Sequence, residues 1–268
     1  MPAETAALAH DADLEADAFS FRLRARAFAP HYHPAWVLGC VLDGARRVWV
    51  RGREYRARSG DVVVLRPGDV HACAPADGGP FVWRGFLFRE GSAAADLLES
   101  LTRGEATLEP VRAGGAVIDE LLAVHALMGA STPAEGKRKR LLAAIARLGG
   151  CARTADAGPA APAPREPALE ALRNHLAAHA GERVSLEDMA VMAHMGKFRL
   201  VRAFARMTGV TPYRYLESAR VNRAQELLAQ GLPPAEAALE SGFADQSHLS
   251  RAFRTRLGVT PGACRRHP

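Results

Sequence analysis

The sequence has no long hydrophobic run, few cysteines and few aromatic residues. No apolar stretch approaches the roughly 20 residues that a membrane-spanning helix needs. The four cysteines include no C-x-x-C pair, which argues against a zinc ribbon and a disulfide framework. The first 18 residues are acidic, whereas a secretion signal begins with basic residues. We therefore expect a cytoplasmic protein with reduced thiols and no contact with a membrane.

The distribution of charge along the chain is uneven. Residues 165–268 hold 15 Lys and Arg against 10 Asp and Glu, whereas residues 1–164 hold 20 against 19. A basic C-terminal third is typical of nucleic-acid binding, although many proteins with other functions share such a balance. The hydrophobic fraction of 48% excludes a wholly disordered chain, and 268 residues are enough for two ordinary domains.

Residues 155–167, ADAGPAAPAPREP, are rich in proline and alanine and carry no apolar periodicity, which predicts an extended linker. The chain before it begins with an acidic stretch and has a short basic run, KRKR at 137–140, for which a solvated helix face is the default interpretation. We predict an acidic N-terminal arm at 1–18, a barrel at 19–90, a helical region at 91–152, the linker at 153–167 and a second domain at 168–268.

The first domain changes period along its length. Phe19, Phe21 and Leu23 alternate with polar residues, which is the period of a β-strand, and further short apolar runs follow between glycine-containing turns. They predict a small antiparallel sandwich or barrel. After residue 92, apolar residues recur at intervals of three and four and predict two amphipathic helices that join near 129–133.

The second domain is helical in period and contains an internal repeat. Arg202-Ala203-Phe204 followed by Gly209-Val210-Thr211-Pro212 returns as Arg251-Ala252-Phe253 followed by Gly258-Val259-Thr260-Pro261, with an offset of 49 residues. Each glycine is placed to end a helix, and each Thr-Pro is placed to begin the next one. The repeat therefore predicts two helix-turn-helix units.

The second helix of each unit exposes side chains that can read base edges and bind phosphates. A helical bundle with a basic surface, serving as a protein-interaction module, would show the same periodicity. With the apolar residues facing inward, the predicted exposed residues are Lys197, Arg199, Arg202 and Arg206 in the first unit and Gln246, Ser247, His248, Ser250 and Arg251 in the second.

Residues 185–266 resemble the DNA-binding domain of the AraC/XylS family of transcriptional regulators, most specifically in the stretch GFADQSHLSRAF at 242–253. The resemblance implies DNA contacts by Phe198, Val201 and Arg202 and by the five polar residues of the second unit. It also implies a ligand-responsive regulator. Expected partners are double-stranded DNA, a small-molecule effector, a second copy of the chain in a homodimer through the helices of 91–152, and RNA polymerase.

His31-Tyr32-His33 and the run Gly60–His71 resemble the two cupin motifs. A metal-dependent cupin enzyme would combine His31, His33 and His71 with a glutamate a few residues after His33, but this chain has apolar residues there. We therefore predict no metal and no cofactor, with a metal-dependent cupin enzyme that carries a nucleic-acid-binding tail as the alternative. The expected effector-binding residues near the barrel mouth are His31, Tyr32, His33, Trp36, Arg47, Trp49, His71 and Trp83.

The predicted fold class is therefore α+β multidomain, with an N-terminal cupin-like β-barrel followed by helices and a C-terminal all-α domain of two helix-turn-helix units. The function predicted from it is that of a sequence-specific DNA-binding regulator rather than an enzyme.

Overall fold

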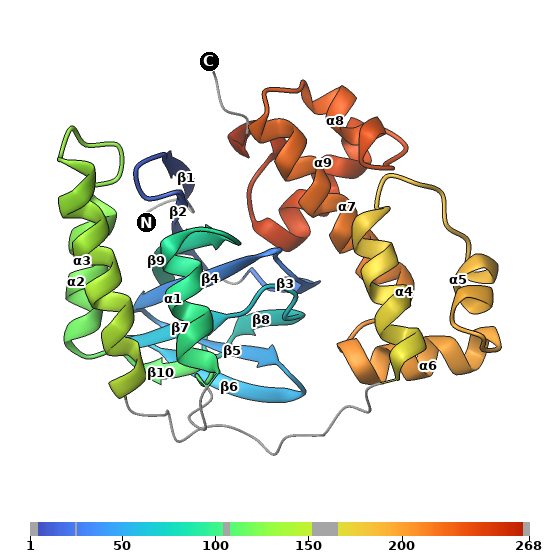
Figure 1. Ribbon diagram of the computed structural model, residues 1–268, viewed down its shortest axis with the longest axis horizontal. Coiled ribbons are helices and arrows are strands. Elements are labelled where there is room, and N and C mark those ends of the chain that lie inside the picture. The colour runs from blue at the N-terminus through green and yellow to red at the C-terminus, as the bar shows by residue number, and fades with distance from the viewer. Residues whose placement is uncertain (1–4, 25, 104–107, 152–165, 265–268) are drawn as a thin grey trace.

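The computed structural model describes residues 5–24, 26–103, 108–151 and 166–264 (Figure 1). It contains an N-terminal barrel of two packed β-sheets, flanked by helices, and a C-terminal helical domain. This confirms the predicted fold class. Residues 152–165, most of the predicted linker, lie outside the described residues.

In the described part of the chain, ten strands form two antiparallel sheets. The larger sheet has the order β1-β2-β9-β4-β7-β10 and the smaller one the order β3-β8-β5-β6. The strands are β1 (Thr5–Asp11), β2 (Ala16–Leu23), β3 (Phe28–His31), β4 (Ala35–Asp43), β5 (Ala45–Val50), β6 (Arg53–Arg58), β7 (Asp61–Leu65), β8 (His71–Pro75), β9 (Phe81–Arg89) and β10 (Val111–Ala113).

Three helices belong to the first domain and six to the second, within the described residues. They are α1 (Ala93–Thr102), α2 (Ala116–Ala126), α3 (Ala134–Arg147), α4 (Pro167–Ala178), α5 (Leu186–Met192), α6 (Lys197–Thr208), α7 (Pro212–Ala229), α8 (Pro234–Glu240) and α9 (Gln246–Leu257). Short 3₁₀ turns follow α3 (Leu148–Gly150) and α9 (Pro261–Cys264). None of the described helices is long and apolar enough to cross a bilayer.

The central strand β4 of the larger sheet is buried on both faces, and its successive side chains point to opposite sides. In β4, Val37 and Val41 face the smaller sheet, whereas Trp36, Leu38 and Cys40 face the helices α1, α2 and α3. The inner core therefore lies between the sheets, and a second core lies beneath the helices.

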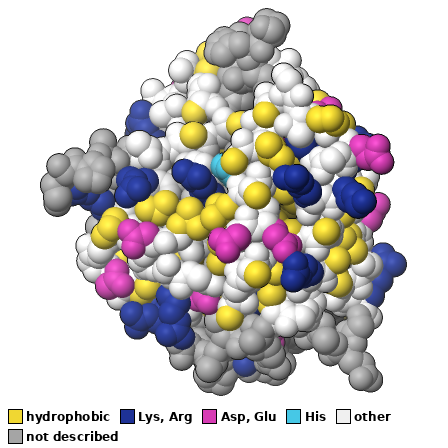
Figure 2. Space-filling model, turned by 90° about the vertical axis from the view of Figure 1, so that its left-hand side faces the viewer, with side chains coloured by type: hydrophobic (Ala, Val, Ile, Leu, Met, Phe, Trp, Pro, Cys, Tyr) yellow, Lys and Arg dark blue, Asp and Glu magenta, His cyan; other side chains and the backbone are white. Residues whose placement is uncertain are grey.

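Apolar side chains of α2, in the region predicted to form a homodimer, pack inside the chain. Val117 and Leu121 of α2 are buried against the larger sheet, and Leu122 packs against the same core. The outer face on this side of the molecule mixes apolar, basic and acidic side chains (Figure 2). These three residues therefore pack within the chain, and the homodimer expected through the helices of 91–152 stays a prediction.

The predicted acidic arm is part of the larger sheet. Thr5–Asp11 forms strand β1, which pairs with β2, and the barrel begins before residue 19. Lys137 of α3 is buried and forms ion pairs with Asp11 (2.9 Å) and Asp13 (2.6 Å), so the solvated position expected for Lys137 is wrong. Burial acts to raise the pKa of Asp11, but the bonds from Lys137 and from the amides of Gly129 and Leu14 lower it overall.

We expect Lys137→Met to lower the melting temperature at pH 7, because it leaves the Asp11 carboxylate buried without its counter-ion. A carboxyl whose pKa is lowered by folding adds stability above its unfolded pKa of about 3.9, and this stability is lost as the pH falls through the lower folded value. The difference in melting temperature between variant and wild type should therefore become smaller below about pH 4. Thermal melts from pH 3 to pH 8 measure it, with the exposed Lys139→Met as the control. Equal melting of both variants at pH 7 would contradict the ion pair's role.

Candidate effector pocket and DNA interface

Three consecutive residues at the end of β3 connect the two domains. The side chains of His31 and His33 point into the barrel, whereas Tyr32 between them is buried in the core of the C-terminal domain. The side chains alternate in direction because successive residues of an extended backbone point to opposite sides. A change at the histidines therefore acts on a segment that also carries a contact of the other domain.

Tyr32 is held by one face of helix α7. Its ring stacks on that of Tyr215 with centroids 4.5 Å apart. Its amide N–H donates to Ser218 Oγ at 3.1 Å, and Asn222 Nδ2 donates to its carbonyl oxygen at 3.1 Å. Residues 215, 218 and 222 lie on the same side of a helix because they are three and four positions apart. The tyrosine is thus fixed through both its ring and its backbone.

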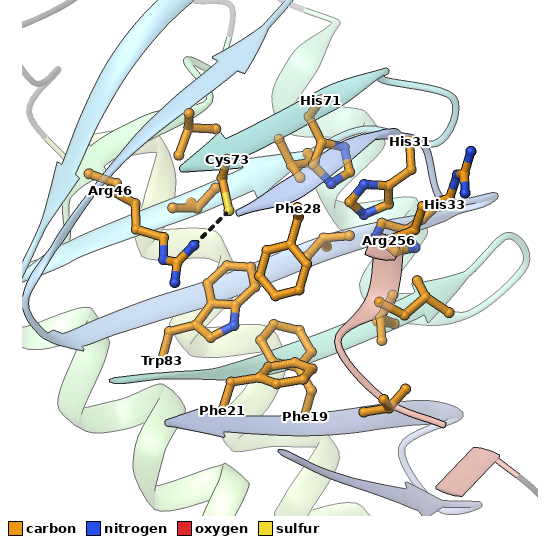
Figure 3. A pocket seen from close by; sticks show the side chains of 18 of the residues that line it. Phe19, Phe21, Phe28, His31, His33, Arg46, His71, Cys73, Trp83 and Arg256 are labelled. Carbon is orange, nitrogen blue, oxygen red and sulfur yellow. Dashed lines mark hydrogen bonds between the residues drawn. The ribbon is translucent and has the colours of Figure 1, made fainter. Parts of the chain in front are cut away.

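The barrel encloses a cavity of about 90 Å³, whose wall is mainly aromatic and aliphatic (Figure 3). Polar groups are found at two places on this wall. In Figure 3, Arg46, Cys73 and Trp83 lie on one side of Phe28, and the histidines lie on the other side with Arg256. An apolar cavity with a few convergent polar groups is the usual form of a small-molecule site.

The three histidines form a neutral cluster of ring nitrogens that lie within 4.8 Å of one another. Burial lowers the pKa of His31 and His71, and it lowers the pKa of His33 to about 3. The Nδ1 atoms of His31 and His71 lie 2.8 and 2.9 Å from the carbonyl oxygens of Ala29 and Asp69. Each Nδ1 therefore carries the proton, and each Nε2 is left as a hydrogen-bond acceptor.

The ligands that this cluster could offer to a metal ion are imidazole nitrogens. Three imidazoles can supply nitrogen ligands for zinc or iron, but no Asp, Glu or Cys side chain of the described residues joins the group. The guanidinium of Arg256 also acts on His31, where its charge contributes to the lowered pKa after burial and the other two histidines.

Arg46, like Arg256, is a charged side chain of the cavity that sequence reasoning missed. Only 1% of its surface is exposed, and it lies over the rings of Phe81 and Phe28 at 4.8 and 5.6 Å. One nitrogen, Nη1, donates to the carbonyl oxygen of Arg26 and lies 3.7 Å from the Cys73 sulfur. The Nε and Nη2 atoms have no hydrogen-bond partner among the described residues. The two-residue period of a strand could have identified Arg46, because it lies on the same face of β5 as Val48 and Val50.

Half of the expected effector-binding residues lie away from the cavity. Arg47 and Trp49 face outward from β5, where the Arg47 guanidinium lies 5.1 Å from the Trp49 ring. Trp36 faces the helices and Tyr32 faces α7, so these four side chains do not line the cavity. Each lies on the opposite face of its strand or segment from a neighbour that does face inward. His31, His33, His71 and Trp83 do line the cavity.

The C-terminal domain supplies part of the cavity wall. Arg256 and Leu257, at the end of α9, face the barrel interior together with Val259. Gly258 has a φ of +74° and lies so close to the Phe28 ring that a Cβ would approach it to 2.8 Å. The Arg26 guanidinium donates to the carbonyl oxygen of Gly258 at 3.0 Å. The end of α9 is therefore packed against the strand that carries the histidines.

Two glycines end helices and Thr211-Pro212 begins one, as predicted, whereas Thr260-Pro261 begins a short 3₁₀ turn and not an α-helix. Ser185 and Asp188 form a capping box at the start of α5, and the Asp245 side chain accepts from the His248 amide at 2.7 Å. Gly209 and Gly258 end α6 and α9 in the left-handed conformation. The inward residues of both helices are buried as expected: Leu200, Ala203 and Phe204 in α6 and Leu249, Ala252 and Phe253 in α9.

The candidate DNA contacts lie on the outer faces of α6 and α9. Phe198 is 86% exposed, an unusual position for a large apolar side chain, and Val201 is half-buried. Arg206 lines a groove that faces the barrel rather than the start of α6. Lys197 forms an ion pair with Glu187, and His248 lies 3.9 Å from Glu217. The remaining candidates, Arg199, Arg202, Gln246, Ser247, Ser250 and Arg251, are exposed or half-exposed.

Comparison with known protein families gives a match to each domain. The AraC-like ligand binding domain matches residues 15–147, and a helix-turn-helix domain matches residues 189–267. The uncharacterized HTH-type transcriptional regulator YbfI of Bacillus subtilis is 29% identical over 93% of this chain and 91% of its own length. The MmsAB operon regulatory protein of Pseudomonas aeruginosa is 28% identical over 80% of this chain and 68% of its own length.

Solved structures share the two-domain fold. ToxT from Vibrio cholerae O395 has a TM-score of 0.55 at 14% identity and covers 92% of this chain and 96% of its own. A ToxT structure from strain SCE256 with a bound unsaturated fatty acid has a TM-score of 0.56 at 12% identity and covers 97% and 95%.

We expect Tyr32→Ala to weaken the contact between the domains by about 3 kcal/mol, because it removes a buried ring from the core around α7. Calorimetry of the full chain should show a lower melting temperature for the helical domain. Tyr213→Ala is the matched control, since Tyr213 lies on the same helix but is 62% exposed. Identical melting curves for the two variants would show that Tyr32 does not couple the domains.

Proposed function

Because the chain belongs to the AraC/XylS family of DNA-binding transcriptional regulators with a ligand-binding domain, we propose that an effector in the barrel cavity controls how helix α9 meets DNA. One observation carries this proposal: α9 takes part in both sites. Arg251 lies on its exposed face, and Leu257 lies on the cavity wall. The two are about 9 Å apart along the helix axis, at a rise of 1.5 Å per residue.

The coupling we propose uses the contacts at both ends of β3. A ligand that shifts the histidines or Phe28 changes the support for Tyr32 on α7 and for Gly258 at the end of α9. Two positions of the helical domain relative to the barrel would then differ in their affinity for DNA, and the ligand would favour one of them. A fatty acid bound to ToxT supports the idea that this fold holds an organic ligand.

Other parts of the functional assignment are also proposals. The named relatives are regulators, which supports a protein without enzymatic activity that works in the cytoplasm. Formation of a homodimer and contact with RNA polymerase stay predictions. The DNA contacts proposed for α6 and α9 rest on their exposure and on the chemistry of their side chains.

We expect Arg251→Ala to lower the affinity for an operator by roughly 10- to 100-fold and to relax the preference at one base pair. The operator is first obtained by selection from random-sequence DNA, and affinities are then measured at several salt concentrations. Arg140→Ala, which removes the same charge from an exposed position on α3, is the control. If both variants lose affinity equally, the contribution of Arg251 is one of overall charge and not of base recognition.

Reciprocity provides a test of coupling that needs no knowledge of the effector. If the cavity controls DNA binding, DNA binding must alter the free energy of the segment between the two sites. Hydrogen exchange of the β3 amides of Phe28, Ala29 and His31 should therefore change when the selected operator is added. The same DNA concentration should cause no change in Arg251→Ala at a salt concentration where its binding is lost. Operator binding with unaltered exchange throughout the barrel would rule out the coupling.

A further inference from the structure

Arg46 is a buried cation without a counter-ion in the described part of the chain. No Asp or Glu of the described residues forms an ion pair with it, and two of its nitrogens lack a hydrogen-bond acceptor. The neighbouring Cys73 supplies no negative charge, because burial raises the pKa of its thiol. Arg256, the other arginine at the cavity, differs in being paired with Glu217.

A second unsatisfied donor lies on the same side of the cavity. The indole Nε1 of Trp83 is buried and has no acceptor among the described residues. Trp83 and Arg46 both line the cavity on the side of Phe28 away from the histidines (Figure 3). Buried donors without acceptors are rare and costly in native proteins, and a bound carboxylate would supply acceptors to both.

The opposite side of the cavity offers acceptors. His31 and His71 are neutral and donate through Nδ1 to backbone carbonyls, so their Nε2 lone pairs are available. The buried Nε of Arg256 is a donor without an acceptor among the described residues. A hydroxyl group can donate to an imidazole nitrogen and accept from a guanidinium at the same time.

The size of the cavity limits the ligand. Its volume of about 90 Å³ provides room for on the order of six to nine water-sized groups, at 10–15 Å³ for each. The wall between the two polar ends is formed by side chains such as Phe28, Val48 and Leu65. The middle of the ligand must therefore be apolar and short.

We propose that the effector is a short apolar carboxylate with a distal hydroxyl group, held by Arg46 and Trp83 at its acid end and by the histidines at the other. This inference rests on the proposed sensing function and assigns the chemical class of its ligand. It gives Arg46 the role of the group that selects an anion. The ligand carboxylate supplies the negative charge that the buried Arg46 guanidinium lacks among the described residues.

The test is a binding panel measured by calorimetry on the full chain. The probes are 4-hydroxybutanoate, 5-hydroxypentanoate and 4-hydroxybenzoate, each compared with its primary amide and with the acid that lacks the hydroxyl. At least one acid should bind 10-fold or more tightly than its amide, because a charge-assisted hydrogen bond favours the acid. That hydroxy acid should also bind more tightly than its deoxy counterpart.

Two variants assign the acid end to its residues. Arg46→Met should remove the preference for the acid over the amide, and Trp83→Phe should reduce acid affinity about 10-fold while keeping a ring at the site. Arg47→Met is the matched control, since it removes the same charge from the outward face of β5 and should bind like the wild type. Circular dichroism confirms folding of each variant, and Trp83→Phe keeps the test valid if Arg46→Met fails to fold.

Several results would overturn the ligand class. These are equal binding of acids and amides, a preference that survives in Arg46→Met, equal binding of hydroxy and deoxy acids, and no binding by any acid in the panel. The sensing function is judged separately from the effect of a bound probe on operator affinity. Amides that bind as well as acids and alter operator affinity would refute only the ligand class. Acids that bind through Arg46 without altering operator affinity would refute only the sensing function.

Discussion

The alternation of three side chains, His31, Tyr32 and His33, across the boundary between the domains is the constraint on which the rest of the structure depends. Extended backbone cannot place consecutive residues on the same side, so histidines in the barrel require a tyrosine that points out of it. The tyrosine is accommodated by α7, whose polar residues bond to its backbone. The two domains are thereby joined at the wall of the cavity, where a ligand has direct access to the joint.

A charged side chain, Arg46, lies in a cavity whose wall is otherwise mostly apolar. Aromatic and aliphatic side chains fill most of the barrel, yet Arg46 lies among them with two nitrogens unsatisfied within the described residues. Burying such a group costs free energy that an apolar residue of the same size would not cost. Structural ion pairs elsewhere, such as Lys137 with Asp11, have both partners inside the chain.

Sequence reasoning predicted most of the fold and part of the site. The 49-residue repeat, the capping residues and the left-handed glycines specify the helical domain because each of these signals is local. Whether a barrel side chain points inward or outward depends on which face of its strand it occupies. The sequence shows this face only where polar and apolar residues alternate clearly. β4 is buried on both faces, so nothing in its sequence distinguished Trp36 from Val37. The contacts of Tyr32 with α7 involve residues about 190 positions apart and leave no local signal.

The last turn of α9 belongs to the DNA-binding domain by sequence and to the sensor by position, since Arg256 and Leu257 complete the cavity wall. The barrel alone therefore does not form the complete ligand-binding cavity. A chimera that joined it to the helical domain of another regulator would inherit a sensor with an incomplete wall unless the residues after Arg254 were transferred with it. Ligand specificity in such a protein is encoded on both sides of the linker, and the two halves must change together during evolution.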